Sequence, residues 1–189
     1  MLRSLFAASV LLVSCPTAPA EPDLAAVNAA AIVQIDCPVA DGWIMGTGFR
    51  IGNLLITAKH VISHEKCFYV GGGNAEIAYS SPSLDYAILK GGKGPFIKVD
   101  CDGFVKGKKY LAVGYARGAP YLTTVELTAT GTNADGFAIL SGIFTFIPGM
   151  SGGPVIDEET GKVVGLINVF QEPEGISGSV ELKNTSVCK

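Results

Sequence analysis

The sequence has few charged residues and very few histidines, and both shortages narrow the classes of function. Asp, Glu, Lys and Arg make up 16% of the 189 residues, and the net charge of −3 offers no basic surface to nucleic acid or to an anionic membrane. The two histidines, His60 and His64, are too few for a histidine-rich metal site, and no glutamate lies between them in a zinc-protease pattern. We therefore expect no nucleic-acid partner, no metal and no cofactor.

The sequence also has no long hydrophobic run of the kind that crosses a membrane, but its N-terminus has the features of an export signal. Arg3 is followed by an apolar stretch, Leu5 to Val13, that is too short to span a bilayer. Two processing routes stay open. Ala18-Pro19-Ala20 fits a signal-peptidase site, which makes residues 1–20 a signal peptide and 21–189 the mature domain. Leu12 to Cys15 resembles a bacterial lipobox, in which Cys15 is lipidated and anchors the protein to a membrane. Either route predicts a periplasmic or secreted protein.

The cysteine count agrees with export. Cys15 leaves the disulfide pool under both routes, and the remaining four cysteines form an even set. An exported chain can keep two disulfides, and four cysteines allow three pairings. The candidates are Cys37, Cys67, Cys101 and Cys188.

The mature chain shows little helical periodicity and many short apolar or alternating runs, separated by turns rich in glycine. This pattern favours an all-β fold over a parallel sheet with crossover helices. The expected strands are 31–35, 46–50, 53–56, 67–70, 75–79, 86–90, 109–114, 122–130, 137–146, 154–156 and 163–169. We expect one helical turn, around residues 60–64, and a last short strand at 180–182.

The stretch Pro148-Gly149-Met150-Ser151-Gly152-Gly153-Pro154 sets one serine among glycines. Glycines allow the backbone to turn sharply, so that the amides of Gly149 and Ser151 can point to one place and form an oxyanion hole. A serine hydroxyl is a weak nucleophile and needs a base. His60 ends the segment Thr57 to His60 after an apolar run, and Asp85 begins the next apolar run. The expected roles are nucleophile for Ser151, general base for His60 and orienting carboxylate for Asp85.

These blocks resemble those of trypsin-like (chymotrypsin-fold) serine peptidases, most of all the compact bacterial members such as the high-temperature-requirement proteases and glutamyl endopeptidases. The resemblance rests on the chain order His, Asp, Ser and on the blocks Gly46 to Phe49, Leu54 to Ile62, Asp85 to Leu89, Val113 to Tyr115, Pro148 to Pro154 and Val163 to Ile167. It implies two antiparallel six-stranded β-barrels, at about 30–102 and 109–182, with the active site in the cleft between them. It also implies a Cys37–Cys67 bridge beside His60, which leaves Cys101 with Cys188.

Two departures from the family pattern affect activation and specificity. Met150 stands where many digestive relatives have an aspartate that pairs with a freed N-terminal amine, so we expect an oxyanion hole that forms without that ion pair. The resemblance places the specificity pocket at Thr145, Asn168, Val169 and Phe170. These residues carry no charge, which predicts cleavage after small or medium apolar residues.

The sequence thus predicts a monomeric, exported serine endopeptidase that acts on protein or peptide substrates through an acyl-enzyme. A catalytically silent binding protein on the same fold and an esterase with the same triad are the alternatives. The chain after Phe170 is shorter than in most relatives, which leaves open how the second barrel is closed.

Overall fold

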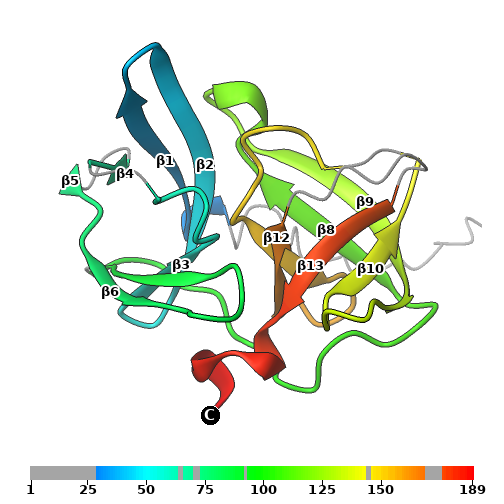
Figure 1. Cartoon of the computed structure of the whole chain (residues 1–189). Helices are drawn as coiled ribbons and strands as arrows, with labels where there is room; N and C mark the ends of the chain where they lie inside the picture. The colour runs from blue at the N-terminus through cyan, green and yellow to red at the C-terminus, as the bar shows by residue number, and fades with distance from the viewer. Residues whose placement is uncertain (1–28, 64–65, 70–72, 92, 144–145, 169–175) are drawn as a thin grey trace, which may run out of the picture.

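The computed structural model describes residues 29–63, 66–69, 73–91, 93–143, 146–168 and 176–189, and the account below concerns these residues. Their regular structure consists of β-strands and three short 3-10 helices (Figure 1). In these ranges no helix has the length and apolar character needed to cross a membrane. The predicted signal peptide, Glu21 and Cys15 lie outside the described residues.

The first half of the chain forms one antiparallel sheet. Its strands are β1 (Ile32–Val39), β2 (Gly42–Ile51), β3 (Leu54–Thr57), β4 (Phe68–Tyr69), β5 (Gly73–Asn74), β6 (Ile77–Ser80) and β7 (Ala87–Lys90). Within the described residues they lie in the order β5-β4-β1-β2-β3-β7-β6. The edge strands β5 and β6 do not pair with each other, so this half is an open, curved sheet where the resemblance implied a closed barrel. The central pair β2 and β3 leads directly into the segment that carries His60.

The second half forms the closed barrel that the resemblance implied. Its strands are β8 (Lys109–Gly114), β9 (Thr123–Thr132), β10 (Ala138–Ser141), β11 (Pro154–Asp157), β12 (Val163–Asn168) and β13 (Ile176–Glu181). The described strands close in the order β10-β13-β12-β11-β8-β9, and this side of the molecule is seen at the right of Figure 1. The all-β fold with two halves of chymotrypsin-like type is therefore confirmed.

Strand β13 closes the second barrel, because it pairs with β12 on one side and with β10 on the other. We expected a strand only from Val180. Ser177 and Ser179 extend it toward the N-terminus, although both are buried, at 1% and 0% exposure. The Ser179 hydroxyl donates a hydrogen bond of 2.8 Å to the Leu166 carbonyl of β12, which satisfies the hydroxyl inside the barrel.

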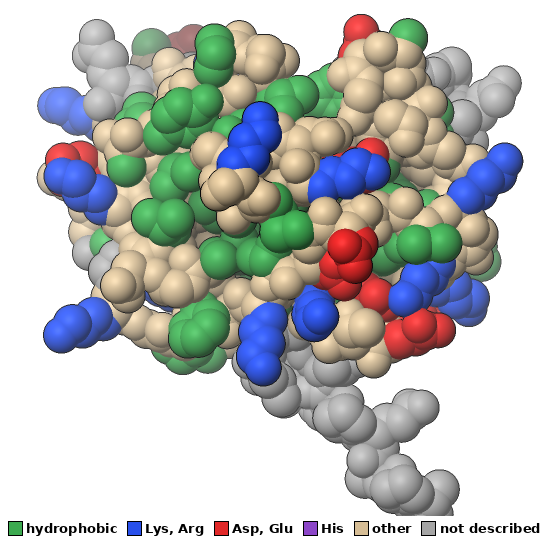
Figure 2. Space-filling model, turned by 90° about the horizontal axis from the view of Figure 1, so that it is seen from below, with side chains coloured by type: hydrophobic (Ala, Val, Ile, Leu, Met, Phe, Trp, Pro, Cys, Tyr) green, Lys and Arg blue, Asp and Glu red, His purple; other side chains and the backbone are tan. Residues whose placement is uncertain are grey.

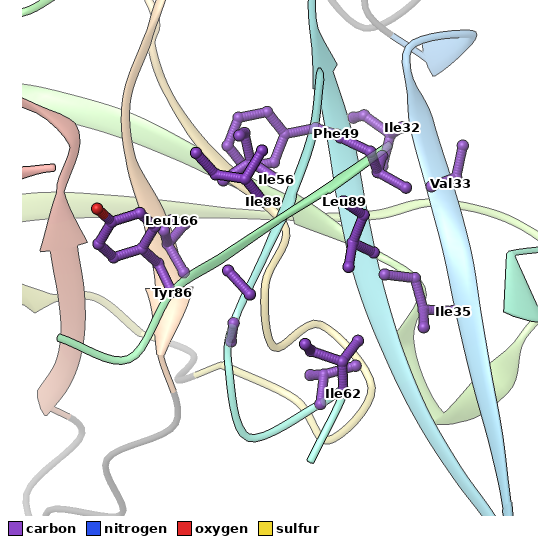
Figure 3. Packing of buried hydrophobic residues seen from close by; sticks show 14 of the residues in the cluster. Ile32, Val33, Ile35, Phe49, Ile56, Ile62, Tyr86, Ile88, Leu89 and Leu166 are labelled. Atoms are coloured by element: carbon purple, nitrogen blue, oxygen red, sulfur yellow. The ribbon is translucent and has the colours of Figure 1, made fainter. Parts of the chain in front are cut away.

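Strands β11 and β12 are buried on both faces because they separate two hydrophobic cores. Val155, Val164 and Ile167 belong to the core inside the barrel. Their sequence neighbours point the opposite way and join a core shared with the first sheet, and these are Ile156, Val163 and Leu166. Figure 3 shows this shared core, in which Leu166 lies among side chains of the first half such as Ile56, Ile88 and Tyr86. In β11 the alternation of a β-strand places Val155 and Ile156 in different cores. In β12, whose pairing with β11 shifts register between Val155 and Ile156, Val164 and Ile167 share a core although they are three residues apart. The shared core holds the two halves together.

The three 3-10 helices are η1 (Ala116–Gly118), η2 (Leu182–Asn184) and η3 (Ser186–Cys188). The last two follow β13 and end at a disulfide between Cys188 and Cys101, which ties the C-terminus to the segment between the halves. A second disulfide joins Cys37 in β1 to Cys67. These are the pairs that the resemblance implied.

Thr47 of β2 joins the two halves by hydrogen bonds. Its side chain is fully buried. The hydroxyl donates to the Gly149 carbonyl at 2.8 Å and accepts from the Tyr115 N–H at 2.9 Å. Its backbone N–H donates to the Ser151 carbonyl at 2.8 Å. One residue of the first sheet therefore fixes two loops of the second barrel, including the one that carries the predicted nucleophile.

We expect Thr47→Val to lower the free energy of unfolding by about 2–4 kcal/mol. The valine has nearly the same shape but leaves the partly buried Gly149 carbonyl and Tyr115 N–H without their partner, and a lost partner costs a buried polar group about 1–3 kcal/mol. Urea unfolding measures the change. The matched control is Thr47→Ser, which keeps the hydroxyl. A Thr47→Val protein as stable as Thr47→Ser would show that the bridge contributes little.

Candidate active site

His60 lies in a turn that follows β3. Val61 N–H bonds to the Ala58 carbonyl and Ile62 N–H to the Lys59 carbonyl, both at 3.2 Å. The segment is thus a pair of hydrogen-bonded turns in place of the expected helical turn. Val61 and Ile62 are buried at 1% and 4% exposure and anchor the turn, whereas the His60 side chain is 45% exposed. Figure 2 shows a face of the molecule on which charged side chains are interspersed with hydrophobic ones, and no histidine is visible on that face.

Asp85 contacts His60 through both carboxylate oxygens. Oδ1 accepts the His60 backbone N–H at 2.9 Å, and Oδ2 lies 2.6 Å from His60 Nδ1. The contact follows from strand pairing, because Ala87 of β7 lies opposite Thr57 of β3. A carboxylate oxygen can only accept, so in the neutral imidazole Nδ1 carries the hydrogen and Nε2 is the acceptor.

The carboxyl group of Asp85 has a pKa below its ordinary value. Partial burial works in the opposite direction, because desolvation penalises the charged form. The hydrogen bonds from the His60 ring and backbone, together with the attraction to the ring, outweigh that penalty. Asp85 is therefore ionised at neutral pH, as a group that stabilises a positive imidazolium must be.

Gly152, the residue after Ser151, packs against the segment that leads to His60. A Cβ on Gly152 would lie 2.6 Å from the backbone N of Ala58 and would also overlap the Thr57 hydroxyl. Only glycine fits there, and its φ of +82° is a further reason. The Ser151 loop is thus in direct contact with the backbone two residues before His60. Among the described residues no hydrogen bond joins the Ser151 hydroxyl to the His60 ring, and such bonds are often long before substrate binds.

The backbone of residues 148–151 leaves only part of its hydrogen-bonding groups paired. All four carbonyls accept a hydrogen bond. That of Pro148 accepts from Arg117 N–H at 2.6 Å and that of Gly149 from the Thr47 hydroxyl at 2.8 Å. That of Met150 accepts from Gly153 N–H at 2.9 Å and that of Ser151 from Thr47 N–H at 2.8 Å. In the part of the chain that the structure describes, the amides of Gly149 and Ser151 donate to nothing. Since backbone amides are normally paired, these two are available to a bound oxyanion.

Met150 anchors this loop in the barrel. Its side chain is completely buried among Val155, Val164 and Ile167. The contact with β8 is close, because a Cβ on Gly114 would lie 2.8 Å from the Met150 Cα. Hydrophobic burial therefore holds the position at which digestive relatives have an aspartate.

The predicted specificity pocket is described only at Asn168, which ends β12 and is 5% exposed. Thr145, Val169 and Phe170 lie outside the described residues, as does His64. Over the described ranges, no group of three or more His, Cys, Asp or Glu side chains is placed to hold a metal ion.

Three residues of the site were missed by sequence reasoning. Thr47, Tyr115 and Arg117 act through backbone groups or a single hydroxyl, at sequence separations of 68 and 102 for the Thr47 hydroxyl bonds. The blocks around Thr47 and Tyr115 were recognised as family motifs, but nothing in their spacing indicates a bridge.

The family model of the trypsin-like peptidase domain matches residues 46–166. The chain belongs to the trypsin-like peptidase family. The match confirms the resemblance drawn from the motifs, and with it the class of serine peptidases. No curated protein matches the chain in sequence.

Solved structures show that this trypsin-like peptidase shares its fold with bacterial proteases. The serine endoprotease from Yersinia pestis is 21% identical with a TM-score of 0.73, over 87% of this chain and 64% of its own. The HtrA-type protease AlgW with tripeptide is 21% identical with a TM-score of 0.72, over 87% and 60%. The active form of the Rv3671c protease from M. tuberculosis is 20% identical with a TM-score of 0.71, over 94% and 89%. The chain thus spans less than two thirds of the first two.

We expect the stability lost in Asp85→Asn to depend on pH. The pKa of Asp85 is lowered by folding, so its ionised form stabilises the protein above its ordinary pKa of 3.8, and this contribution disappears as the pH falls through the lower folded value. Urea unfolding at several pH values measures the gap between the wild type and Asp85→Asn. The gap should be full at pH 7 and should close below pH 3.8. An equal difference in stability at pH 7 and below pH 3.8 would contradict the lowered pKa of Asp85.

Proposed function

We propose that the protein is a serine endopeptidase that hydrolyses peptide bonds through an acyl-enzyme on Ser151. The observation that carries the proposal is the pair of unpaired amides, Gly149 and Ser151, on a loop that contacts the segment of the His60–Asp85 pair. A nucleophile, a base held by a carboxylate and two converging donors are the parts that acyl transfer to a serine requires. The family membership supports the same activity.

In the first half of the reaction, Ser151 Oγ attacks the carbonyl carbon of the substrate and His60 Nε2 takes the hydroxyl proton. Asp85 stabilises the imidazolium that forms, because its carboxylate lies 2.6 Å from Nδ1. The negative oxygen accepts from the amides of Gly149 and Ser151. The C–N bond then breaks, and His60 gives its proton to the leaving amine.

In the second half, water replaces the amine. His60 Nε2 takes a proton from the water as its oxygen attacks the acyl carbon, and the same two amides hold the oxyanion. The bond between the acyl carbon and Ser151 Oγ breaks, and the proton returns to Ser151. No electron transfer and no further reactant is needed.

We propose that cleavage follows small or medium apolar residues. This rests on the uncharged set Thr145, Asn168, Val169 and Phe170 that the resemblance assigns to the pocket. Asn168 is buried at the end of β12, next to the barrel core.

The purified protein should react with a fluorophosphonate probe at Ser151 and should cleave a peptide library after apolar residues. Activation by His60 makes Ser151 nucleophilic, so Ser151→Ala should abolish labelling, and His60→Ala should reduce turnover by about 10⁴-fold or more. Mass spectrometry locates the probe, and sequencing of the products gives the preference.

Other outcomes have distinct meanings in that experiment. A folded wild type that neither reacts nor cleaves would overturn the activity in favour of a binding protein. Turnover of esters alone would indicate an esterase. A strong preference for basic or acidic residues would refute only the proposed pocket.

We also propose that the protein is exported. The N-terminal signal features and the two disulfides support this location, since disulfides persist in oxidising compartments. Mass spectrometry of protein recovered from the producing cell should find a chain that starts at Glu21, or at Cys15 with an attached lipid. A chain that still begins at Met1 would contradict export by either route.

A further inference from the structure

The loop Tyr115–Gly118 packs directly against the loop that carries Ser151. A Cβ on Gly149 would lie 2.8 Å from the Arg117 backbone N and would overlap the Tyr115 carbonyl oxygen. Gly149 has a φ of +94°, so a side chain is excluded there both by space and by conformation. The two backbones therefore touch with nothing between them, and the shape of one determines the shape of the other.

Arg117 has an unusual backbone conformation in this loop. Its φ of 52° and ψ of 29° are left-handed, and within the described ranges it is the one residue other than glycine with a positive φ. Left-handed backbone is unfavourable for an L-residue, because Cβ approaches the following carbonyl oxygen too closely. The arginine side chain is exposed, so its packing gives no reason for the conformation. A strained backbone that persists is held by its surroundings, and strain of this kind gathers at functional sites.

Both ends of the loop are fixed. On one side, Tyr115 N–H bonds to the Thr47 hydroxyl at 2.9 Å. On the other, Ala119 N–H bonds to the Ala116 carbonyl at 2.9 Å, and Gly118 lies against the end of the Met45 side chain. With these ends held, the left-handed turn at Arg117 is what allows its N–H to face the Ser151 loop.

The Arg117 N–H donates to the Pro148 carbonyl at 2.6 Å, and this bond fixes the peptide unit between Pro148 and Gly149. Every described peptide bond is trans. In a planar trans peptide the carbonyl and the N–H point in opposite directions, so a carbonyl held toward Arg117 turns the Gly149 N–H away from it. Rotation of this peptide would remove the Gly149 donor and place a carbonyl oxygen where the oxyanion has to lie.

We propose that Arg117 is a positioning residue whose left-handed backbone keeps the Gly149 amide directed into the oxyanion hole. This rests on the proposed peptidase activity. The role belongs to the backbone N–H and its orientation, and the guanidinium group has no part in it. Arg117 thereby does, from a separate loop, part of what an ion pair at position 150 does in digestive relatives.

The test compares Arg117→Gly with Arg117→Val. Both remove the same cation and keep the N–H, but glycine accepts a positive φ easily whereas a β-branched residue resists it. We expect Arg117→Gly to lose less kcat than Arg117→Val. Arg117→Val should lower kcat by about 10-fold to 100-fold with little change in KM, below the 10²–10³-fold loss of a whole oxyanion donor.

Two further readouts separate positioning from a general loss of structure. The affinity for a peptidyl boronate, which mimics the tetrahedral intermediate, should fall in Arg117→Val by the same factor as kcat/KM. The proton NMR signal of the His60 Nδ1–H should stay unchanged in both variants, because among the described residues no hydrogen bond joins Arg117 to His60 or Asp85. If Arg117→Val does not fold, Arg117→Asn and Arg117→Thr form a second pair, since asparagine tolerates the left-handed region.

Equal kcat and boronate affinity in the two members of a pair would overturn the inference while leaving the peptidase intact. A folded wild type that neither cleaves peptides nor reacts at Ser151 would instead overturn the proposed function, and the inference with it. The two failures are therefore distinguishable in one set of measurements.

Discussion

The site depends most on the hydrogen bonds of Thr47. This residue belongs to the first sheet, yet its partners are Tyr115, Gly149 and Ser151 of the second barrel. Thr47 and Ser151 are buried and the Tyr115 and Gly149 groups are partly buried, so an unmade bond is poorly replaced by water and a mismatch is penalised. The position of Ser151 relative to His60 is therefore a property of the contact between the halves and not of either half alone.

Around this contact, apolar burial and backbone geometry act together. The core shared by β11, β12 and the first sheet fixes the distance between the halves, and Met150 anchors the Ser151 loop from inside the barrel. The carbonyls of residues 148–151 are then all paired, by Thr47, Arg117 and Gly153, and the amides of Gly149 and Ser151 have no partner within the described part of the chain. A preorganised pair of donors needs no rearrangement when charge develops, and this is the source of most catalytic stabilisation in such sites. In the proposed mechanism, the pairing of all four carbonyls of residues 148–151 is what holds the two donors in place.

The parts of the molecule that sequence reasoning predicted are those with local signals. Alternating apolar runs indicated most strands, and β8 was predicted at its observed bounds, Lys109–Gly114. Strand β13 was predicted too short, because the buried Ser177 and Ser179 look like turn residues until the Leu166 carbonyl is seen to pair one of them.

The open edges of the first sheet could not be predicted from the sequence. Whether β5 and β6 meet and close the sheet depends on its curvature, which no local pattern of residues indicates. The roles of Thr47 and Arg117 also had no local signal in the sequence. Thr47 acts through hydrogen bonds to residues far away in the chain, and Arg117 has a positive φ although it is not a glycine. His60, Asp85 and Ser151 could be proposed early because His60 ends a recognisable block, Asp85 begins one and Ser151 lies among glycines inside another. The structure brings the first two into contact.

The most direct measurement of the central claim is a crystal structure of the protein with a peptide aldehyde bound. The account predicts a covalent hemiacetal on Ser151 Oγ, with its oxygen within hydrogen-bond distance of both the Gly149 and Ser151 amides. It also predicts that Thr47 still bridges Tyr115 and Gly149, because the hole exists before substrate arrives. An adduct on another residue would contradict the account. So would an adduct on Ser151 whose oxygen faces away from the two amides.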